Sequence, residues 1–234
     1  MSEQGTDARN IPPPLRIHHL MTWMAATAAL ISICLWFDRT MRNGPPITNG
    51  VVIAALVMFA IAVAGALNFA AWGLAMRKRG HAFPLQPGDW LVLMVAVAAV
   101  WFAASVILSF AVFFALGPGA FAVVWVSSRL ALLVGLMVTC VGIARPRSDT
   151  AMWRAAFLLL AAVPVLVWAV GATAAATAIV AALNLASWSD WRRRMPRSWM
   201  HWIGVILVAT LVISCGVISL IPTMEHSQAS GWLR

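Results

Sequence analysis

Long apolar runs constrain this chain more than any other feature. Runs of 20 and more apolar residues recur from Leu20 to Ile221, and the longest polar segment is the first 19 residues. Soluble domains carry about 45–50% apolar and about 25% charged residues. This chain is 62% hydrophobic and 10% charged, with a mean hydropathy of +0.90. The sequence therefore predicts an all-α, polytopic bundle of transmembrane helices.

Five spans are bounded by clear turn residues. They cover approximately residues 20–37, 50–75, 90–115, 120–143 and 202–221. Glycine and proline mark breaks at 43–46, 86–89 and 117–119, and the last break is so short that a tight antiparallel hairpin is expected. A polar N-terminal arm, residues 1–19, precedes the single bundle of residues 20–221, and a short tail, residues 222–234, follows it.

The segment from Ala155 to Ser189 decides the number of spans. It contains no charged residue, and as one helix it would be about 50 Å long, against about 30 Å of hydrocarbon. Two spans, residues 153–170 and 172–189 with a break near Gly171, fit the bilayer better and bring the total to seven. The alternative is one long helix kinked at Pro164, which leaves six spans.

The basic residues test the span number independently, because cytoplasmic loops are enriched in lysine and arginine. With seven spans and a cytoplasmic N-terminus, only Arg39, Arg42 and Arg234 lie on the non-cytoplasmic side. Twelve lie on the cytoplasmic side: Arg9, Arg16, Arg77, Lys78, Arg79, Arg145, Arg147, Arg154, Arg192, Arg193, Arg194 and Arg197. With six spans, nine basic residues would lie on the cytoplasmic side and six on the non-cytoplasmic side. We therefore predict seven spans in the cell inner membrane, with a cytoplasmic N-terminus and a non-cytoplasmic C-terminus.

The formal charge of +9 is concentrated at the ends of apolar runs. Clusters at Arg77–Arg79 and Arg192–Arg197 lie where topology determinants and contacts to anionic lipid headgroups are expected. The predicted partner is thus the lipid bilayer, and no nucleic acid is expected. Small residues, among them Gly65, Gly135 and the alanine-rich stretch 172–182, predict close helix packing and a compact bundle.

A seven-residue segment occurs twice. Ala66–Trp72 recurs as Ala182–Trp188 with five of seven positions identical, and a basic triplet follows each copy. With seven spans both copies end on the same side, which indicates a parallel repeat of three spans, one linking span and three spans. The alternative is that both copies are ordinary interfacial helix ends. The arrangement is similar to that of sugar facilitators in topology alone, and that family's motifs are absent.

A few polar residues fall at membrane depth. Arg129 lies about 15 Å from the outer end of its span. One interpretation is that it contacts an anion or substrate with the help of Ser127 and Ser128. The alternative is a structural role, in which the guanidinium binds backbone carbonyls or snorkels to the membrane surface. Asn68 and Asn184 lie about 12 Å below the interface. They either line a common axis or form ordinary hydrogen bonds between helices.

Other titratable residues give weaker indications. His18, His19, His81 and His201 fall on the predicted cytoplasmic face, and haem or metal ligation would require two of them to converge. All seven acidic residues fall in predicted loops or tails, which argues against an acidic proton relay. The three cysteines lie inside apolar runs, so we expect no disulfide or metal site there. No catalytic residue, metal or cofactor is predicted.

The loop Gly80–Trp90 resembles the pattern Phe-Pro-x-Gln-Pro-Gly-x-Trp of uncharacterised bacterial multi-pass membrane proteins. The resemblance implies a membrane protein and no known activity. From the residues themselves, Gln86, Pro87 and Gly88 predict a turn, and Asp89 is the expected N-cap of the third span.

Three functions follow from these observations. The leading hypothesis is a non-enzymatic structural, accessory or interaction bundle, because no convergent catalytic set is found. The second is a facilitator for a small solute or anion, built on Arg129, Asn68 and Asn184. The third is a redox subunit that binds haem or quinone through the cytoplasmic-side histidines.

Overall fold

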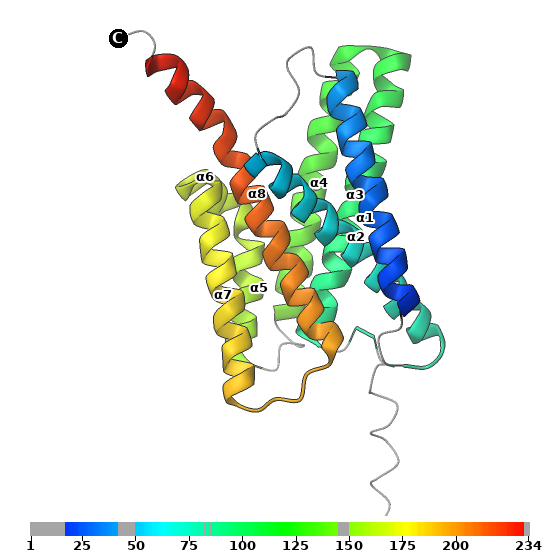
Figure 1. Ribbon diagram of the computed structural model, residues 1–234, viewed down its shortest axis with the longest axis vertical. Helices are drawn as coiled ribbons and strands as arrows, with labels where there is room; N and C mark the ends of the chain where they lie inside the picture. Colours follow the sequence, from blue (N-terminus) through cyan, green and yellow to red (C-terminus); the bar gives the residue numbers. More distant parts are fainter. Residues whose placement is uncertain (1–16, 42–49, 82, 85, 145–149, 232–234) are drawn as a thin grey trace, which may run out of the picture.

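The computed structural model describes residues 17–41, 50–81, 83–84, 86–144 and 150–231. Within these ranges the chain is all-α, as predicted, and forms eight helices (Figure 1). They are α1 (Ile17–Met41), α2 (Gly50–Lys78), α3 (Pro87–Leu116), α4 (Pro118–Ala144), α5 (Ala151–Ala161), α6 (Val163–Val170), α7 (Ala172–Arg192) and α8 (Trp199–Gly231). The predicted N-terminal arm as far as residue 16, together with Arg42, Arg145, Arg147 and Arg234, lies outside the described residues.

Five of the helices are long and apolar enough to cross a membrane: α2, α3, α4, α7 and α8. Two shorter apolar helices, 17–33 and 151–161, accompany them. The predicted spans and the observed helices agree to within a few residues for most of the chain. The exception is α8, which begins at Trp199 rather than 202 and continues to Gly231. Length and composition therefore identify a multi-pass membrane protein.

Helix α8 organises the bundle, because it packs against α2, α3 and α7 (Figure 1). Helix α1 packs on the outside of α2, and α4 packs against α3 and α5. The core contains Phe69, Trp153, Phe157, Leu183 and Leu207, all at most 2% exposed. By contrast, the most apolar stretch of α4 contains no buried residue, so α4 is the helix with the largest face left uncovered.

The segment from α5 to α7 contains both breaks that the sequence indicated. The α5 helix ends before Ala162, and α6 carries Pro164 in its first turn, where the missing amide hydrogen of proline is tolerated. The α6 helix ends at Val170, and Gly171 has φ 85° and ψ 161°, a conformation that is essentially restricted to glycine. Because α7 packs against both α5 and α6, the chain reverses direction at Gly171.

The turn between α3 and α4 is as tight as predicted. Gly117 has φ 86° and its amide donates to the carbonyl of Phe113 at 3.0 Å. The two helices then pack side by side, with the rings of Phe113 and Phe121 5.8 Å apart. Further along the hairpin, Trp101 Nε1 donates to the carbonyl of Ser128 at 3.1 Å.

Candidate functional site

The described residues contain two features that simple helix packing does not require: a buried polar junction and an apolar cavity. The junction lies at one end of the bundle, which we call the basic end. There α2 and α7 finish in Arg77, Lys78 and Arg192, and α3 and α8 begin (Figure 1). The cavity lies between six helices, α3 to α8, in the body of the bundle.

Asp190, in the last turn of α7, is the centre of the junction. Its side chain is fully buried, and its Oδ2 accepts from Trp153 Nε1 of α5 at 2.7 Å and from Arg197 Nε at 2.9 Å. A second bond runs from Arg197 Nη2 to Oδ1 at 3.2 Å. The guanidinium and carboxylate thus form a two-point, charge-assisted pair that is removed from water. This arrangement fastens α5, the end of α7 and the segment before α8 together.

His201 continues the junction from α8 to α3. Its Nδ1 accepts from the backbone amide of Gly88 at 3.0 Å, and its Nε2 lies 3.8 Å from Asp190 Oδ2. An acceptor at Nδ1 requires a lone pair, so the proton of this imidazole is on Nε2, the nitrogen that faces the carboxylate. The ring also meets the edge of Trp153 at 5.1 Å.

Glycine is required where α3 crosses α8. A Cβ atom on Gly88 would overlap the backbone of His201, and one on Gly204 would overlap the carbonyl of Gly88. Beside this crossing, Gln86 Oε1 accepts from both the amide and the hydroxyl of Ser198, at 2.9 and 3.1 Å. Gln86 is the N-cap of α3, and Asp89 Oδ2 accepts from the Gln86 amide at 3.0 Å. Asp89 was predicted as the N-cap and instead lies at the third helical position.

Two predictions about charged residues are corrected here. The acids were all expected in loops or tails, whereas Asp89 and Asp190 are buried in helix ends, 5% and 0% exposed. Arg197 was expected to contact lipid headgroups together with Arg192, Arg193 and Arg194. Its side chain is 4% exposed and paired with Asp190, so it belongs to the protein interior. Arg192–Arg194 and Arg77–Arg79 are exposed, as a headgroup contact requires.

Arg129 lies half-buried between α3 and α4. Its guanidinium carbon lies 4.0 Å from the ring centre of Phe102 and 4.1 Å from that of Trp125. The buried Nε has no hydrogen-bond partner, and no acidic side chain of the described residues pairs with this arginine. The hydroxyls of Ser127 and Ser128 donate to carbonyls of their own helix, at 3.2 and 3.0 Å. Both serine hydroxyls are thus bonded within α4 and make no hydrogen bond to the guanidinium in the described residues.

The two asparagines of the repeated segment have different environments. Asn68 Nδ2 donates to the carbonyl of His19 at 3.0 Å, and its Oδ1 accepts from Thr22 at 3.1 Å, which joins α2 to α1. Asn184 is exposed on α7, and no hydrogen bond to its side chain is found within the described ranges. The two amides do not meet on a common axis, and Asn68 has the ordinary interhelical role.

The histidines also separate into different surroundings. His18 and His19 are neighbours on α1 with ring centres 4.0 Å apart, and His19 contacts the edge of Trp72 at 5.2 Å. His81 is half-buried after the end of α2, and His201 belongs to the junction. Within the part of the chain that the structure describes, no group of three or more His, Cys, Asp or Glu side chains is placed to hold a metal ion.

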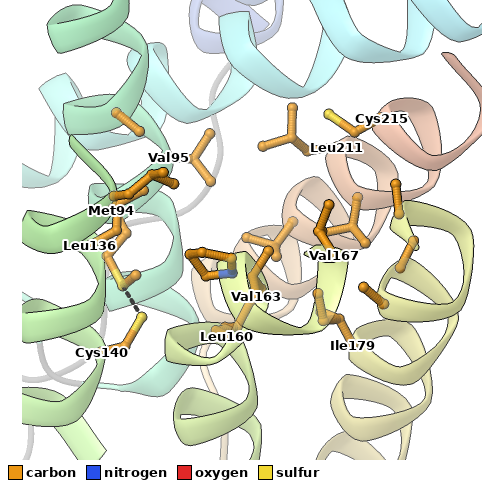
Figure 2. Close-up of a pocket in the computed structure, with 18 of the residues that line it drawn as sticks. Met94, Val95, Leu136, Cys140, Leu160, Val163, Val167, Ile179, Leu211 and Cys215 are labelled. Atoms are coloured by element: carbon orange, nitrogen blue, oxygen red, sulfur yellow. Dashed lines mark hydrogen bonds between the residues drawn. The ribbon is translucent and has the colours of Figure 1, made fainter. Parts of the chain in front are cut away.

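The apolar cavity has a volume of about 390 Å³ (Figure 2). Its walls come from α3, α4, the α5–α6 pair, α7 and α8, and on each wall the lining residues follow one helical spacing, i, i+3, i+4 and i+7. On α3 these are Leu91, Met94, Val95 and Ala98, and on α8 the series begins at Val208. Figure 2 shows Val163, Leu211 and Ile179 around this shared space. The predicted compact bundle is therefore hollow between these helices.

Among the described residues that line the cavity, sulfur atoms are the only side-chain heteroatoms. They belong to Met94, Met137, Cys140 and Cys215, and the Cys140 Sγ lies 4.0 Å from the Met94 Sδ (Figure 2). Such a lining can hold hydrocarbon but offers little to orient a polar solute. The volume falls within the range of about 300–1,000 Å³ that is usual for small-molecule sites.

Sequence reasoning missed the junction and the cavity for different reasons. The junction was signalled in part by the repeat, because the spacing that separates Asn68 from Asn184 also separates Gly88 from Gly204. Those two glycines are in contact in the fold. The cavity left no such signal, because its lining residues read as ordinary core positions. Comparison with known protein families, with curated proteins and with solved structures finds no match for this chain.

Proposed function

We propose that this chain is a non-enzymatic, seven-span accessory protein of the cell inner membrane, which binds a partner transmembrane helix on its α3–α4 face. The observation that carries the proposal is the position of Arg129. A cation at membrane depth normally faces the interior of a bundle or a charged partner. Here it lies half-buried on α4, whose most apolar stretch has no buried residue, between the rings of Phe102 and Trp125 and without an acidic partner among the described residues.

The seven-span topology adds α1 and the α5–α6 pair to the five long apolar helices. Together α5 and α6 cover about 30 Å, which is enough to cross the hydrocarbon once. The basic end then faces the cytoplasm, in agreement with the positive-inside rule. A reporter enzyme fused after Arg234 should be active outside the cytoplasm. Cytoplasmic activity of that fusion would contradict seven spans.

The chemistry of Arg129 defines the partner. None of the seven acidic residues falls within α4 or near the middle of another helix, so a second copy of this chain would bring an additional arginine and no carboxylate. The fitting partner is a transmembrane helix of another protein with Asp or Glu at the same depth. Val126 and Leu130, which flank Arg129 on α4 and are 63% and 61% exposed, supply the apolar surface for that helix.

The test uses a photoreactive amino acid at position 126 in living cells. We expect crosslinking to one membrane protein with an intramembrane carboxylate, and loss of the crosslink with Arg129→Met. The control Lys78→Met removes an exposed charge at the basic end and should leave the crosslink unchanged. Arg129→Glu should abolish the contact, and a partner variant with arginine in place of its carboxylate should restore it. Crosslinking that is equal in Arg129→Met and in the unmodified protein would contradict the proposal.

The other two hypotheses have less support. A facilitator would require Arg129, Asn68 and Asn184 around one path, whereas Arg129 contacts rings of α3 and α4, Asn68 bonds to α1, and Asn184 is exposed on α7. A haem subunit would require two histidines with free nitrogens facing one site, and His201 already binds Gly88. A visible spectrum of the purified protein tests the haem hypothesis, because a Soret band would indicate bound haem.

The resemblance of the 83–90 loop to uncharacterised membrane proteins fits the same proposal. Gln86 and Gly88 make contacts with Ser198 and His201 that depend on an amide side chain and on a missing Cβ. We therefore interpret the pattern as a helix junction rather than a catalytic motif.

A further inference from the structure

We propose that the apolar cavity is a binding site for one hydrocarbon chain of a membrane phospholipid. This inference does not depend on the partner helix at Arg129. It rests on the chemistry of the wall, on the shape of the cavity and on the side through which it can be reached.

The shape suits a chain that runs along the helices. On each of five walls the lining residues extend over seven positions, from Leu91 to Ala98 on α3 and from Ala172 to Ile179 on α7. Two helical turns give a height of about 10 Å along the bundle. A phospholipid chain in the surrounding bilayer has the same direction, so it can enter without turning over.

The space exists because small residues stand where large ones would fill it. Ala98, Ala172, Ala175 and Ala176 face the cavity, and so does Gly216. The α5–α6 pair lines the wall on both sides of its interruption at Ala162, with Leu160 before it and Val163 and Pro164 after it. Side chains of ordinary size at the alanine and glycine positions would close the core.

The cavity has a natural entrance from the lipid. On the α7–α8 side the wall is closed, since a Cβ on Gly216 would lie 3.1 Å from that of Ala176. On the opposite side, α4 packs against α3 and α5 while α6 packs against α7. The structure shows no extensive packing between α4 and α6, and the cavity is partly open, so this seam is the entrance that we propose.

The lining favours a phospholipid chain over a quinone or another polar ring. A quinone needs donors for its carbonyl oxygens, whereas the described wall offers only thiol and thioether groups. A phospholipid meets this restriction, because its headgroup remains at the membrane surface and only its chain enters.

The experiment uses the full chain in vesicles of phosphatidylethanolamine and phosphatidylglycerol. A fraction of the phosphatidylglycerol carries a diazirine near the end of one acyl chain, and the adducts are mapped by mass spectrometry. We expect adducts inside the cavity, at Leu136, Leu160 or Val163, in addition to adducts on the lipid-facing surface of α4, such as Val123. Ala98→Phe and Ala172→Phe, on two different helices, should each abolish the cavity adducts and leave the surface adducts unchanged.

Ala104→Phe is the matched control, because Ala104 is on α3 but is exposed and does not line the cavity. It should retain every adduct. The proposal would be overturned by cavity residues that stay unlabelled while α4 is labelled. It would also be overturned by cavity adducts that persist in both Ala98→Phe and Ala172→Phe. A competition experiment gives the last contradicting outcome: a short-chain quinone removes the cavity adducts, whereas excess unlabelled phospholipid does not.

Discussion

At the scale of single residues, Asp190 shows how a charge is kept inside an apolar bundle. Three nitrogen atoms donate to its carboxylate, two of them from Arg197, and His201 lies beside it. A buried ion pair need not add stability compared with an apolar pair, but removal of one partner leaves the other charge without compensation. The junction is therefore a strong determinant of which helix ends lie together, and it is vulnerable to single substitutions.

We predict that Asp190→Asn lowers the free energy of unfolding by about 3–5 kcal/mol, because it leaves the buried Arg197 guanidinium without a negatively charged partner. Arg197→Gln should have a similar effect. The double variant should lose less free energy of unfolding than the sum of the losses in the two single variants. Arg193→Gln, at an exposed position of the same loop, is the control. Unfolding in mixed detergent micelles, followed by tryptophan fluorescence, measures all four. Additive losses in the double variant would show that the two residues do not act as a pair.

The repeated segment supplies a second test at this scale. Asn68 joins α1 to α2 through His19 and Thr22, whereas Asn184 is exposed on α7. Replacing Asn68 by leucine should destabilise the protein by about 0.6–2 kcal/mol, the usual range for interhelical hydrogen bonds in membranes. Asn184→Leu should leave stability unchanged or raise it, because it replaces an exposed amide for which the described residues supply no partner. Equal losses of unfolding free energy in Asn68→Leu and Asn184→Leu would contradict this difference between the two asparagines.

At the scale of helices, the number of passes depends on a single glycine. Gly171 separates α6 from α7 with φ 85° and ψ 161°, so an L-residue there would be strained. Gly171→Ala should lower the unfolding free energy by about 1–3 kcal/mol. Gly119→Ala, in the first turn of α4, has an ordinary φ and no atom within 4 Å of the new Cβ, so it should have little effect. Thermal unfolding of both variants, with helix content from circular dichroism, provides the comparison.

The helices were predictable because lipid imposes a length and a composition on each of them. Apolar runs and the glycines at 117 and 171 were sufficient to place most boundaries. The junction was not predictable in the same way, because Trp153, Asp190 and Gly88 are far apart in sequence. Each of them is also explained by an ordinary local role, such as a turn residue or a loop residue. Asp190 resembled a loop acid, and only the tertiary position of Arg197 makes it a core residue.

At the scale of the whole molecule, the polar and apolar features are separated in space. The junction lies at the basic end, the cavity lies within the bundle, and Arg129 lies half-buried between α3 and α4. Residue types alone could not predict this division, since Ala98 and Ala172 on the cavity wall look like the small residues that elsewhere bring helices together. At Gly65, for example, an added Cβ would lie 2.8 Å from Leu207. Whether a small residue closes or opens the core depends on the path of the neighbouring helices.

An unoccupied cavity of this size would be costly. At about 24 cal/mol per Å³, the value for closed cavities, a volume of about 390 Å³ sets an upper limit on the order of 10 kcal/mol, since this cavity is partly open. That is comparable with the whole stability of a typical domain, about 5–15 kcal/mol. Lipid that fills the space should therefore contribute to folding as a bound ligand does, by an amount that rises with its concentration.

This reasoning predicts a lipid-dependent melting temperature. Protein stripped of lipid in detergent should melt at a lower temperature, and added phosphatidylglycerol should raise it, with a gain of about 2.7 kcal/mol at a hundredfold excess over the dissociation constant. Ala98→Phe should melt higher than the unmodified protein without lipid, because the ring fills part of the void, and should respond less to added lipid. Ala104→Phe should respond as the unmodified protein does, since its side chain lies outside the cavity. The same lipid response in Ala98→Phe and Ala104→Phe would mean that lipid stabilises the outer surface of the bundle instead of its interior.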